Sequence, residues 1–357
     1  MTGTLKGLVL AGGAGTRLRP ITHTSAKQLV PVANKPVLFY GLEALRDAGI
    51  RQVGIIIGDT GDEIREAVGD GSALGIEVTY IPQSAPLGLA HAVLTAADFL
   101  GDHPFVMYLG DNLLRDGITP LVERFRASSP DAMILLQQVP DPESYGVAEL
   151  DGDRVVRLEE KPEQPRSDLA LVGVYMFTPA IIDAARAIAP SARGELEITD
   201  AIQYLIDQGM RVEPHVVTGW WKDTGRLEDM LEANRLILDV IQPRMDGELI
   251  DSTIEGRVVV EAGARLVNSH VRGPAVIGCD ALVENAYVGP YSSISTGCVV
   301  RGAEIEHSIL LERSRIEDLD ARVESSLIGR DVVISRTDAK PRAYRFLVGD
   351  SSVIGLT

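Results

Sequence analysis

Residues 8–36 read LVLAGGAGTRLRPITHTSAKQLVPVANKP, and this stretch decides how the rest of the chain is interpreted. The apolar run from Leu5 to Leu10 predicts a buried strand, and it leads directly into a turn with three glycines among residues 12–15. Glycines let backbone amides approach phosphate oxygens closely, and Arg17 and Lys27 supply positive charge. The stretch therefore predicts an anion-binding loop at the end of the first strand.

The charge distribution supports a local anion site. The formal net charge of −17 argues against a general nucleic-acid binder, which needs a cationic face. Residues 1–50, however, hold six Lys/Arg against two Asp/Glu, a net of +4, whereas the other 307 residues carry a net of −21. We expect the anion to bind within the first fifty residues.

Length and composition predict a globular protein of about two domains, since the chain has 357 residues, 45% hydrophobic and 24% charged. The longest apolar run, Leu169 to Phe177, is shorter than the roughly 18 residues that a transmembrane helix needs. The run Leu8 to Ala11 is too short for a signal peptide, so we expect a cytoplasmic protein. Cys279 and Cys298 lack disulfide or metal spacing, and we expect both to be buried.

The first 240 residues alternate apolar runs with helix-like segments, which predicts a mixed or parallel sheet covered by helices on both faces. We expect helices at Pro36–Ala48, which has Gly49 at its end, and at Arg226–Ile241, which Pro243 follows closely. The further predicted strands are Val53–Ile57, Glu77–Ile81, Phe105–Leu109 and Ala132–Gln138.

A six-residue period replaces this pattern after residue 243. Aliphatic residues recur at every sixth position in three runs, which are Ile254, Val260 and Leu266; Val276, Leu282, Val288, Ile294 and Val300; and Leu310, Ile316, Ile328 and Ile334. Only Arg322 interrupts the last run. This period predicts hexapeptide β-helix repeats with four to five coils of eighteen residues. An ordinary all-β domain is the alternative.

The glycine-rich loop belongs to neither of two common phosphate-binding motifs. No GxxxxGK[ST] sequence occurs, and Leu18 stands where the third glycine of GxGxxG is required. By itself, this glycine-rich sequence is explained equally well by a phosphate-binding loop and by a tight turn with only a structural role. The loop must therefore be judged together with the motifs that follow it.

Residues 8–36 resemble the signature of the sugar-1-phosphate nucleotidylyltransferases. Other family landmarks follow in order, namely Gln83, Pro86–Ala90, Leu109–Asn112, Tyr145-Gly146, Glu159–Pro162, Gly194–Asp200 and Trp220–Gly225. The chain most resembles the thymidylyltransferases of this family that carry C-terminal hexapeptide repeats. The resemblance implies a Rossmann-like α/β nucleotidyltransferase domain at 1–240 and a left-handed parallel β-helix at 241–357.

The implied reaction joins dTTP and glucose 1-phosphate into dTDP-glucose and releases pyrophosphate. A phosphate monoester is largely dianionic at neutral pH, because its second pKa is about 6, so the reaction needs no general base. It needs cations and positioning. Asp111 and Asp223 are the expected Mg²⁺ ligands, since Mg²⁺ prefers one or two carboxylates plus phosphate oxygens.

The resemblance assigns the other site residues to three groups. The expected catalytic residues are Arg17, Lys27 and Lys161, which contact phosphates, and Asp111 and Asp223, which hold the metal. The expected nucleotide-binding residues are Leu10, Gly12, Gly13, Gly15, Thr16, Arg17, Gln28, Gln83, Gly88 and Asp111. The expected sugar-phosphate pocket consists of Tyr145, Gly146, Glu160 and Lys161.

Several alternatives remain open. The same reaction with UTP or GTP and another sugar 1-phosphate keeps every motif, and a non-catalytic regulator on this fold is a further class. A bifunctional enzyme would add acyl transfer in the repeats, but His270 and His307 fit loop or surface histidines better, and His23 and His91 are assigned no role. We expect Trp220 and Trp221 to pack, and the repeats to favour a homo-oligomer.

Overall fold

The computed structural model describes residues 4–13, 15–23, 25–336, 344 and 346–355. Ala14 of the glycine-rich loop lies outside the described residues, as do residues 337–343, 345, 356 and 357 of the predicted repeat domain. Contacts between residues divide the chain into two compact units. The first unit consists of 1–14, 25–29 and 37–223, and the second of 15–24, 30–36 and 224–357.

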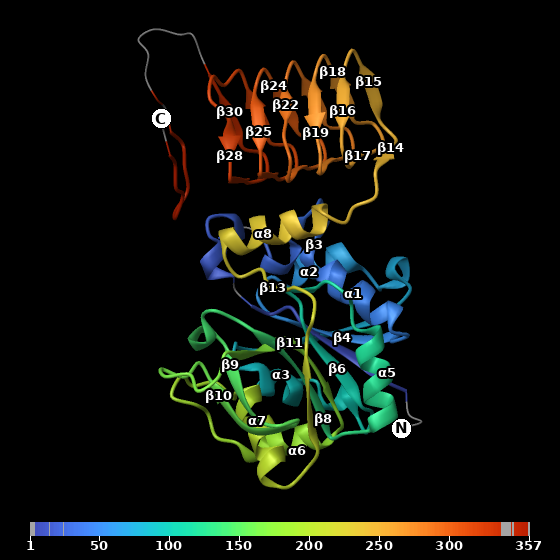
Figure 1. The fold of residues 1–357 in the computed structure, drawn as a ribbon, viewed down its shortest axis with the longest axis vertical. Helices are drawn as coiled ribbons and strands as arrows, with labels where there is room; N and C mark the ends of the chain where they lie inside the picture. The colour runs from blue at the N-terminus through green and yellow to red at the C-terminus, as the bar shows by residue number, and fades with distance from the viewer. Residues whose placement is uncertain (1–3, 14, 24, 337–343, 345, 356–357) are drawn as a thin grey trace. The chain divides into compact units, whose positions relative to one another are not determined.

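A nine-stranded mixed sheet forms the centre of the first unit (Figure 1). Its strands are β1 (Lys6–Leu10), β4 (Gln52–Ile57), β5 (Glu77–Pro82), β6 (Phe105–Leu109), β8 (Ala132–Gln138), β9 (Gly146–Asp151), β10 (Arg154–Glu160), β11 (Leu169–Phe177) and β12 (Val212–Val216). Strands β6, β1, β4 and β5 are parallel, and β11 runs antiparallel to β6 and β8. All five strands predicted from the sequence are confirmed to within one residue.

Helices cover both faces of this sheet, as predicted. One face carries α1 (Val37–Asp47), α2 (Gly61–Val68) and α5 (Thr119–Ser128); the other carries α3 (Leu89–Thr95), α4 (Ala97–Leu100), α6 (Ala180–Ala187) and α7 (Ile198–Asp207). The strands contribute to both cores because alternate side chains point to opposite faces, so Val9 of β1 lies in one core and Leu8 in the other.

Both helices predicted from start and stop signals are confirmed. The first is α1, after which Gly49 takes a left-handed φ of +79° and its amide donates a hydrogen bond to the Arg46 carbonyl. The second is α8 (Leu227–Leu238), whose contacts place it in the second unit. In the described part of the chain, none of the helices combines the length and apolarity that crossing a membrane requires.

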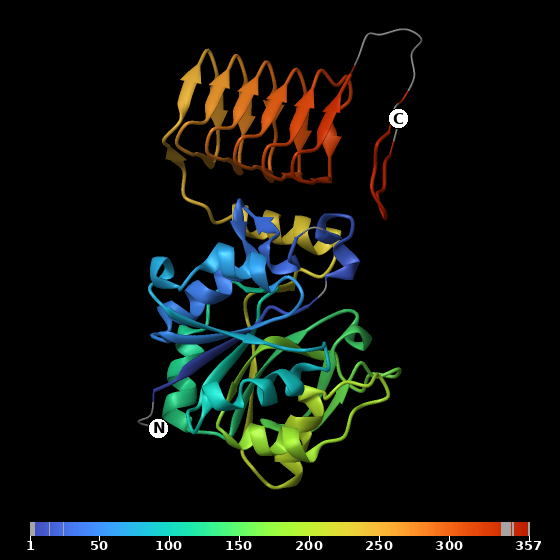
Figure 2. The ribbon, with the colours of Figure 1, turned by 180° about the vertical axis from the view of Figure 1, so that it is seen from behind.

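Three parallel sheets form the β-helix of the second unit, and their strands stack as successive rungs (Figure 2). Two sheets have six strands and the third has five. The strands β14 to β30 are, in order, Arg244–Met245, Glu248–Ile250, Thr253–Glu255, Val258–Val260, Arg265–Val267, His270–Arg272, Ala275–Ile277, Leu282–Glu284, Tyr287–Val288, Ser292–Ile294, Val299–Arg301, Glu304–Glu306, Ile309–Leu310, Arg315–Glu317, Val323–Glu324, Leu327–Ile328 and Val333–Ser335. This is the architecture of a left-handed parallel β-helix built from hexapeptide repeats, as predicted.

The coil length and part of the repeat phase differ from the prediction. Val260 pairs with Ile277, so this coil has 17 residues rather than eighteen. Two members of the six-residue period, Val276 and Leu282, are not part of the β-helix core cluster, which contains the next residues, Ile277 and Val283. Val276 is nevertheless buried. With six strands in two of the sheets, the stack is also longer than predicted.

Arg322, which interrupts the sequence period, is accommodated on the outside of the β-helix. Its guanidinium donates to Glu304 at 2.9 Å and to Glu306 at 2.5 Å. The following residue, Val323, packs against the core in its place. The repeat therefore continues structurally where it is lost in the sequence.

Candidate functional site

Lys27 lies between the carboxylates of Asp111 and Asp223. Lys27 begins the short 3₁₀ helix η3 (Lys27–Leu29), Asp111 follows β6, and Asp223 ends the short strand β13 (Trp221–Asp223). The ammonium nitrogen is 2.5 Å from Asp111 Oδ2 and 3.5 Å from Asp223 Oδ1. The structure thus brings together three predicted site residues that are up to 196 positions apart.

The lysine keeps Asp111 ionised. Burial by itself would raise the pKa of Asp111, but attraction to Lys27 and hydrogen bonds from Lys27 and Asn112 outweigh burial and lower it. Lys27 has only 6% of its surface exposed, so its charge acts in a poorly solvated site. The site is a compact arrangement of one cation and two carboxylates.

Asn112 is a buried residue that connects the two segments carrying Asp111 and Asp223, and the sequence predicts no role for it. Its Nδ2 donates to Asp111 Oδ1 at 2.8 Å, and its Oδ1 accepts hydrogen bonds from the Trp221 indole at 2.5 Å and the Gly173 amide at 3.2 Å. In the antiparallel pair of β7 (Asn112–Leu114) and β13, Asn112 lies opposite Asp223. Its position beside Asp111 was the one sign of a role in the site. Its other partners, Trp221 and Gly173, are too distant in the sequence to be predicted.

The two aspartates fit a shared divalent cation. Both carboxylates reach the same ammonium nitrogen, so their oxygens can also reach one common ion. Among the residues that the structure describes, no group of three or more His, Cys, Asp or Glu side chains is arranged to hold a metal. Two carboxylates suit Mg²⁺ when substrate phosphates and water complete its coordination.

The first part of the predicted nucleotide-binding loop lies beside two glutamines. The loop leaves β1 after Leu10; a Cβ at Gly12 would lie 3.7 Å from Gln83 Oε1, and one at Gly13 would lie 3.6 Å from Gln28 Nε2. Gln28 is 2% exposed, and its buried Oε1 has no hydrogen-bond partner among the described residues. Such an acceptor costs free energy unless a ligand satisfies it.

His91 orients the side chain of Gln83, and this contact was not predicted from the sequence. Gln83 Nε2 lies 2.9 Å from His91 Nδ1, in the first turn of α3. With the amide donating to the imidazole nitrogen, Gln83 retains one N–H and its carbonyl oxygen for a ligand. His91, to which the sequence assigns no role, therefore orients a predicted nucleotide-binding residue.

Gly88 adopts a conformation that requires glycine. Its φ is +104°, and a Cβ there would lie 2.3 Å from the Leu196 carbonyl oxygen. Leu196 itself accepts a hydrogen bond from the Ala90 amide and donates one to the Leu87 carbonyl. This close approach fixes the segment that leads from Gly88 into α3.

Gly15, Thr16 and Arg17 belong to the second unit by their contacts. Gly15 takes a left-handed φ of +61° before the 3₁₀ helix η1 (Thr16–Leu18), and its carbonyl accepts a hydrogen bond from Thr22 Oγ1 at 2.6 Å. Their predicted contacts with the triphosphate stay a prediction.

The predicted sugar-phosphate residues lie together at the start of β9 and the end of β10. Gly146 pairs with Glu160, and the Lys161 amide donates to the Tyr145 carbonyl at 3.0 Å. Lys161 itself has a left-handed φ of +42°. Burial and the nearby Glu197 raise the pKa of Glu160, although the cations around it partly oppose the shift.

Arg193 is a second cation beside these residues, and it was not predicted from the sequence. Its guanidinium lies 3.4 Å from Glu160 and 2.9 Å from Glu195. The only sequence signal was its position directly before the Gly194–Asp200 landmark. A partly desolvated carboxylate, Glu160, thus lies close to the charges of Lys161 and Arg193.

The expectations for the remaining side chains are largely met. Trp221 packs edge-on against Tyr145, with 5.4 Å between ring centroids, as expected of a packing residue. Cys298 is buried, but Cys279 is only half-buried, so that part of the cysteine prediction is wrong. His270 keeps 41% of its side chain exposed, as expected of a surface histidine.

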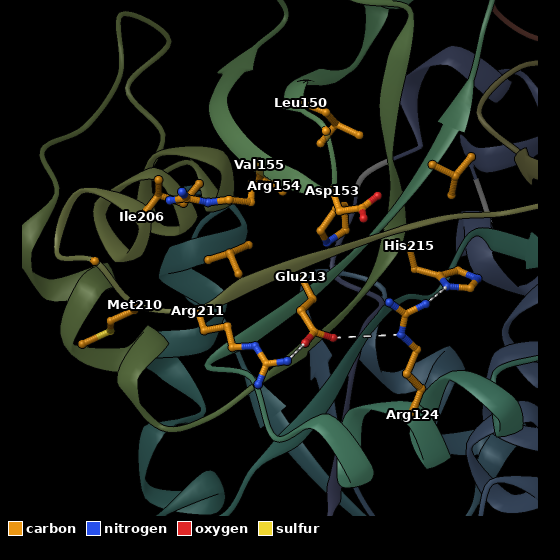
Figure 3. Close-up of a pocket in the computed structure, with 15 residues that line it drawn as sticks. Arg124, Leu150, Asp153, Arg154, Val155, Ile206, Met210, Arg211, Glu213 and His215 are labelled. Carbon is orange, nitrogen blue, oxygen red and sulfur yellow. Dashed lines mark hydrogen bonds and ion pairs between the residues drawn. The ribbon is translucent and has the colours of Figure 1, made fainter.

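A cavity of about 830 Å³ lies elsewhere, along β12 and the β9–β10 turn (Figure 3). Glu213 points between Arg124 and Arg211 and forms ion pairs with both, while Arg124 also contacts His215. None of the predicted site residues lines this cavity. Because no predicted site residue lines it, this cavity is not assigned to the reaction, despite its size.

Comparison with known proteins agrees with this geometry. Residues 6–240 match the nucleotidyl transferase family, and residues 288–343 match the GlmU-like C-terminal hexapeptide family. The chain belongs to the nucleotidyl transferase family. Family members of this kind are enzymes of nucleotide sugar biosynthesis and are metal-dependent in general.

The most similar relatives include glucose-1-phosphate thymidylyltransferases over nearly the whole chain. The proteins from Streptomyces griseus and Streptomyces antibioticus are 59% and 58% identical and cover 98% of this chain; the alignments span 98% and 99% of the relatives. A low-salt glycan biosynthesis nucleotidyltransferase of Haloferax volcanii is 47% identical over 99% of this chain and all of its own length. This nucleotidyl transferase therefore shares both of its regions with full-length relatives.

Solved structures support the catalytic fold. A Bacillus anthracis protein described as a putative glucose-1-phosphate thymidylyltransferase, in complex with sucrose, superposes with a TM-score of 0.63 at 36% identity, and covers 67% of this chain and 98% of its own. A UDP-glucose pyrophosphorylase complexed with UDP-glucose gives 0.60 at 25% identity, and covers 66% of this chain and 99% of its own.

Proposed function

We propose that this nucleotidyl transferase joins dTTP and glucose 1-phosphate to form dTDP-glucose and pyrophosphate. The observation that carries the proposal is the convergence of Lys27, Asp111 and Asp223, three residues that the sequence resemblance selected independently of the structure. Relatives of about 59% identity that bear the thymidylyltransferase name support the choice of substrates.

In the proposed reaction, a phosphate oxygen of glucose 1-phosphate forms a bond to the α-phosphorus of dTTP. The bond from that phosphorus to the α,β-bridging oxygen breaks, and pyrophosphate leaves with the electron pair. The attacking phosphate is already dianionic, so the protein needs to remove no proton. Its task is to bring two anions together and to stabilise the charge on the transferred group.

Lys27 is proposed to supply the fixed positive charge at the α-phosphate, with Arg17 contacting the triphosphate. Asp111 and Asp223 would hold Mg²⁺, which when bound neutralises phosphate charge. Lys27 pairs with both carboxylates, which holds the three side chains close to one another.

The two substrates are proposed to be recognised by separate sets of residues. Gln83, held by His91, presents an N–H and a carbonyl oxygen to the pyrimidine edge, and the buried Oε1 of Gln28 offers an acceptor to the nucleotide. Glu160 accepts hydrogen bonds from sugar hydroxyls, while Lys161 and Arg193 face the sugar phosphate.

Other parts of the proposal concern the whole chain. We propose a catalytic domain at 1–240 and a repeat domain at 241–357, a cytoplasmic location, and a homo-oligomer that assembles through the β-helix. Light scattering of the full chain tests the assembly: a monomer at micromolar concentration would contradict it.

Pyrophosphate release, measured over a grid of dTTP, UTP, GTP and CTP against glucose, galactose and mannose 1-phosphates, tests the reaction. We expect the pair dTTP and glucose 1-phosphate to have the highest kcat/KM. A higher value for another pair would reassign the substrates, and no release from any pair would refute the reaction. Acetyl-CoA consumption, measured alongside, tests the acyltransferase alternative.

A further inference from the structure

Asn234 of α8 is a buried residue whose side chain joins three segments of the second unit. Its Oδ1 accepts hydrogen bonds from the Ala33 amide at 2.9 Å and from Ser293 Oγ at 2.7 Å. Its Nδ2 donates to the Tyr291 carbonyl at 2.9 Å. An Asn at this position thus links α8, the segment 30–36 and one coil of the β-helix.

The segment 30–36 is a tight hairpin that the β-helix contacts at a second point. Its strands are β2 (Pro31–Val32) and β3 (Lys35–Pro36), and the two turn residues, Ala33 and Asn34, have φ values of +48° and +62°. Asn34 Nδ2 donates to the Ile294 carbonyl at 2.7 Å. Strand β23, which contains Ser293 and Ile294, therefore holds the hairpin both directly and through Asn234.

A second piece of the 8–36 signature lies against the last coils of the β-helix. In the segment 15–24, Ile21 Cδ1 lies 3.5 Å from the position a Cβ would take at Gly329. Both parts of the signature that leave the first unit, 15–24 and 30–36, are thus grouped with the β-helix. One of them carries Arg17, and the other begins one residue after η3, which carries Lys27 and Gln28.

We propose that the β-helix is an internal scaffold for these signature segments, and that Asn234 and Ser293 are positioning residues for Lys27 and Gln28. The proposal rests on the catalytic role proposed above for Lys27. A hairpin fixed directly after η3 restricts the backbone conformations open to η3, and small errors in the position of a catalytic group are costly in rate. The scaffold role requires neither acyl transfer nor self-association.

Two variants weaken the anchor without placing a strained residue in the hairpin. Asn34→Gly removes the bond to Ile294, and glycine adopts a φ of +62° without cost. Ser293→Ala removes one of the two donors to Asn234. Ser308→Ala is the matched control, because Ser308 is equally buried and its hydroxyl bonds to Glu306 and Ser326, both within the β-helix.

Hydrogen exchange of full-length protein and steady-state kinetics with dTTP and glucose 1-phosphate provide two separate readouts. In the double variant Asn34→Gly/Ser293→Ala, we expect faster exchange across residues 27–36 and a kcat lower by about tenfold, corresponding to two lost hydrogen bonds, with KM for glucose 1-phosphate nearly unchanged. Ser308→Ala should alter neither the exchange of the hairpin nor kcat.

Unchanged exchange across 27–36 in the double variant would overturn the anchoring. Faster exchange with an unchanged kcat would overturn the positioning role. A wild-type protein that releases no pyrophosphate would instead refute the proposed function, while the exchange data would still report on the anchor.

Discussion

Replacing Asn112 with Ala tests whether one buried amide holds together the two segments that carry Asp111 and Asp223. Asn112 is 2% exposed, so its removal leaves the Trp221 indole N–H and the Gly173 N–H as buried donors without an acceptor. Each such donor costs about 1–3 kcal/mol. Together the two donors predict a loss of about 2–6 kcal/mol in the free energy of unfolding of the first unit.

The activity should fall as well, because Asp111 loses the hydrogen bond that orients its carboxylate. A loss of position at a metal ligand should lower kcat by roughly 10–100-fold. Urea unfolding followed by tryptophan fluorescence reports on the first unit selectively, since the chain has two tryptophans, Trp220 and Trp221, and both lie in that unit.

Two controls separate this role from general disruption. Trp221→Phe removes one donor but keeps an aromatic ring beside Tyr145, and the Gly173 amide still satisfies Asn112, so we expect a loss of only about 1 kcal/mol. Glu123→Ala, at an exposed position of α5 in the first unit, should change the free energy of unfolding by less than about 0.5 kcal/mol. If Asn112→Ala also stays within that margin and keeps full kcat, the reasoning about Asn112 is refuted.

Three further predictions concern the aspartates, the nucleotide side and the sugar side. Asp111→Asn should leave the fold intact and lower kcat by about 10²–10³-fold. Asp116→Asn, at the surface, should leave both the fold and kcat unchanged, and equal kcat in the two variants would contradict the metal assignment. Gly88→Ala should raise KM for dTTP and destabilise the protein by a few kcal/mol, because its Cβ would collide with Leu196; thermal melting and dTTP titration measure both effects, and wild-type values would contradict the close approach. Burial and a neighbouring carboxylate raise the pKa of Glu160. The folded state therefore binds the proton of Glu160 more tightly than the unfolded chain does, and ionisation of Glu160 destabilises the fold. Glu160→Gln should therefore melt at a higher temperature than wild type near pH 7, and the advantage should shrink as pH falls toward the pKa of an ordinary glutamate; an advantage that grows with falling pH would contradict the sign.

The catalytic fold was largely predictable because its strands are short, almost wholly apolar runs between polar segments. The phase of the β-helix was less predictable for a physical reason. At Val276-Ile277 and Leu282-Val283, two neighbouring aliphatic residues compete for one core position, and a 17-residue coil selects the second of each pair. A sequence period of six cannot distinguish them.

Site residues were predictable where a motif carries the chemistry, as with Lys27 and Asp111. The residues that orient the site were not, because their partners are remote in sequence: the indole that bonds Asn112 lies 109 residues away, and the hydroxyl that bonds Asn234 lies 59 residues away. A buried Asn in a helix or strand gives no signal of what it will contact.

The transfer itself is tested most directly by following oxygen. Glucose 1-phosphate labelled with ¹⁸O in its phosphate is incubated with the protein, Mg²⁺ and dTTP, and both products are analysed by mass spectrometry. Attack of the sugar phosphate on the α-phosphorus predicts that all of the label appears in dTDP-glucose and that the pyrophosphate is unlabelled. Label in the pyrophosphate, or the absence of a labelled nucleotide sugar, would contradict the proposed reaction.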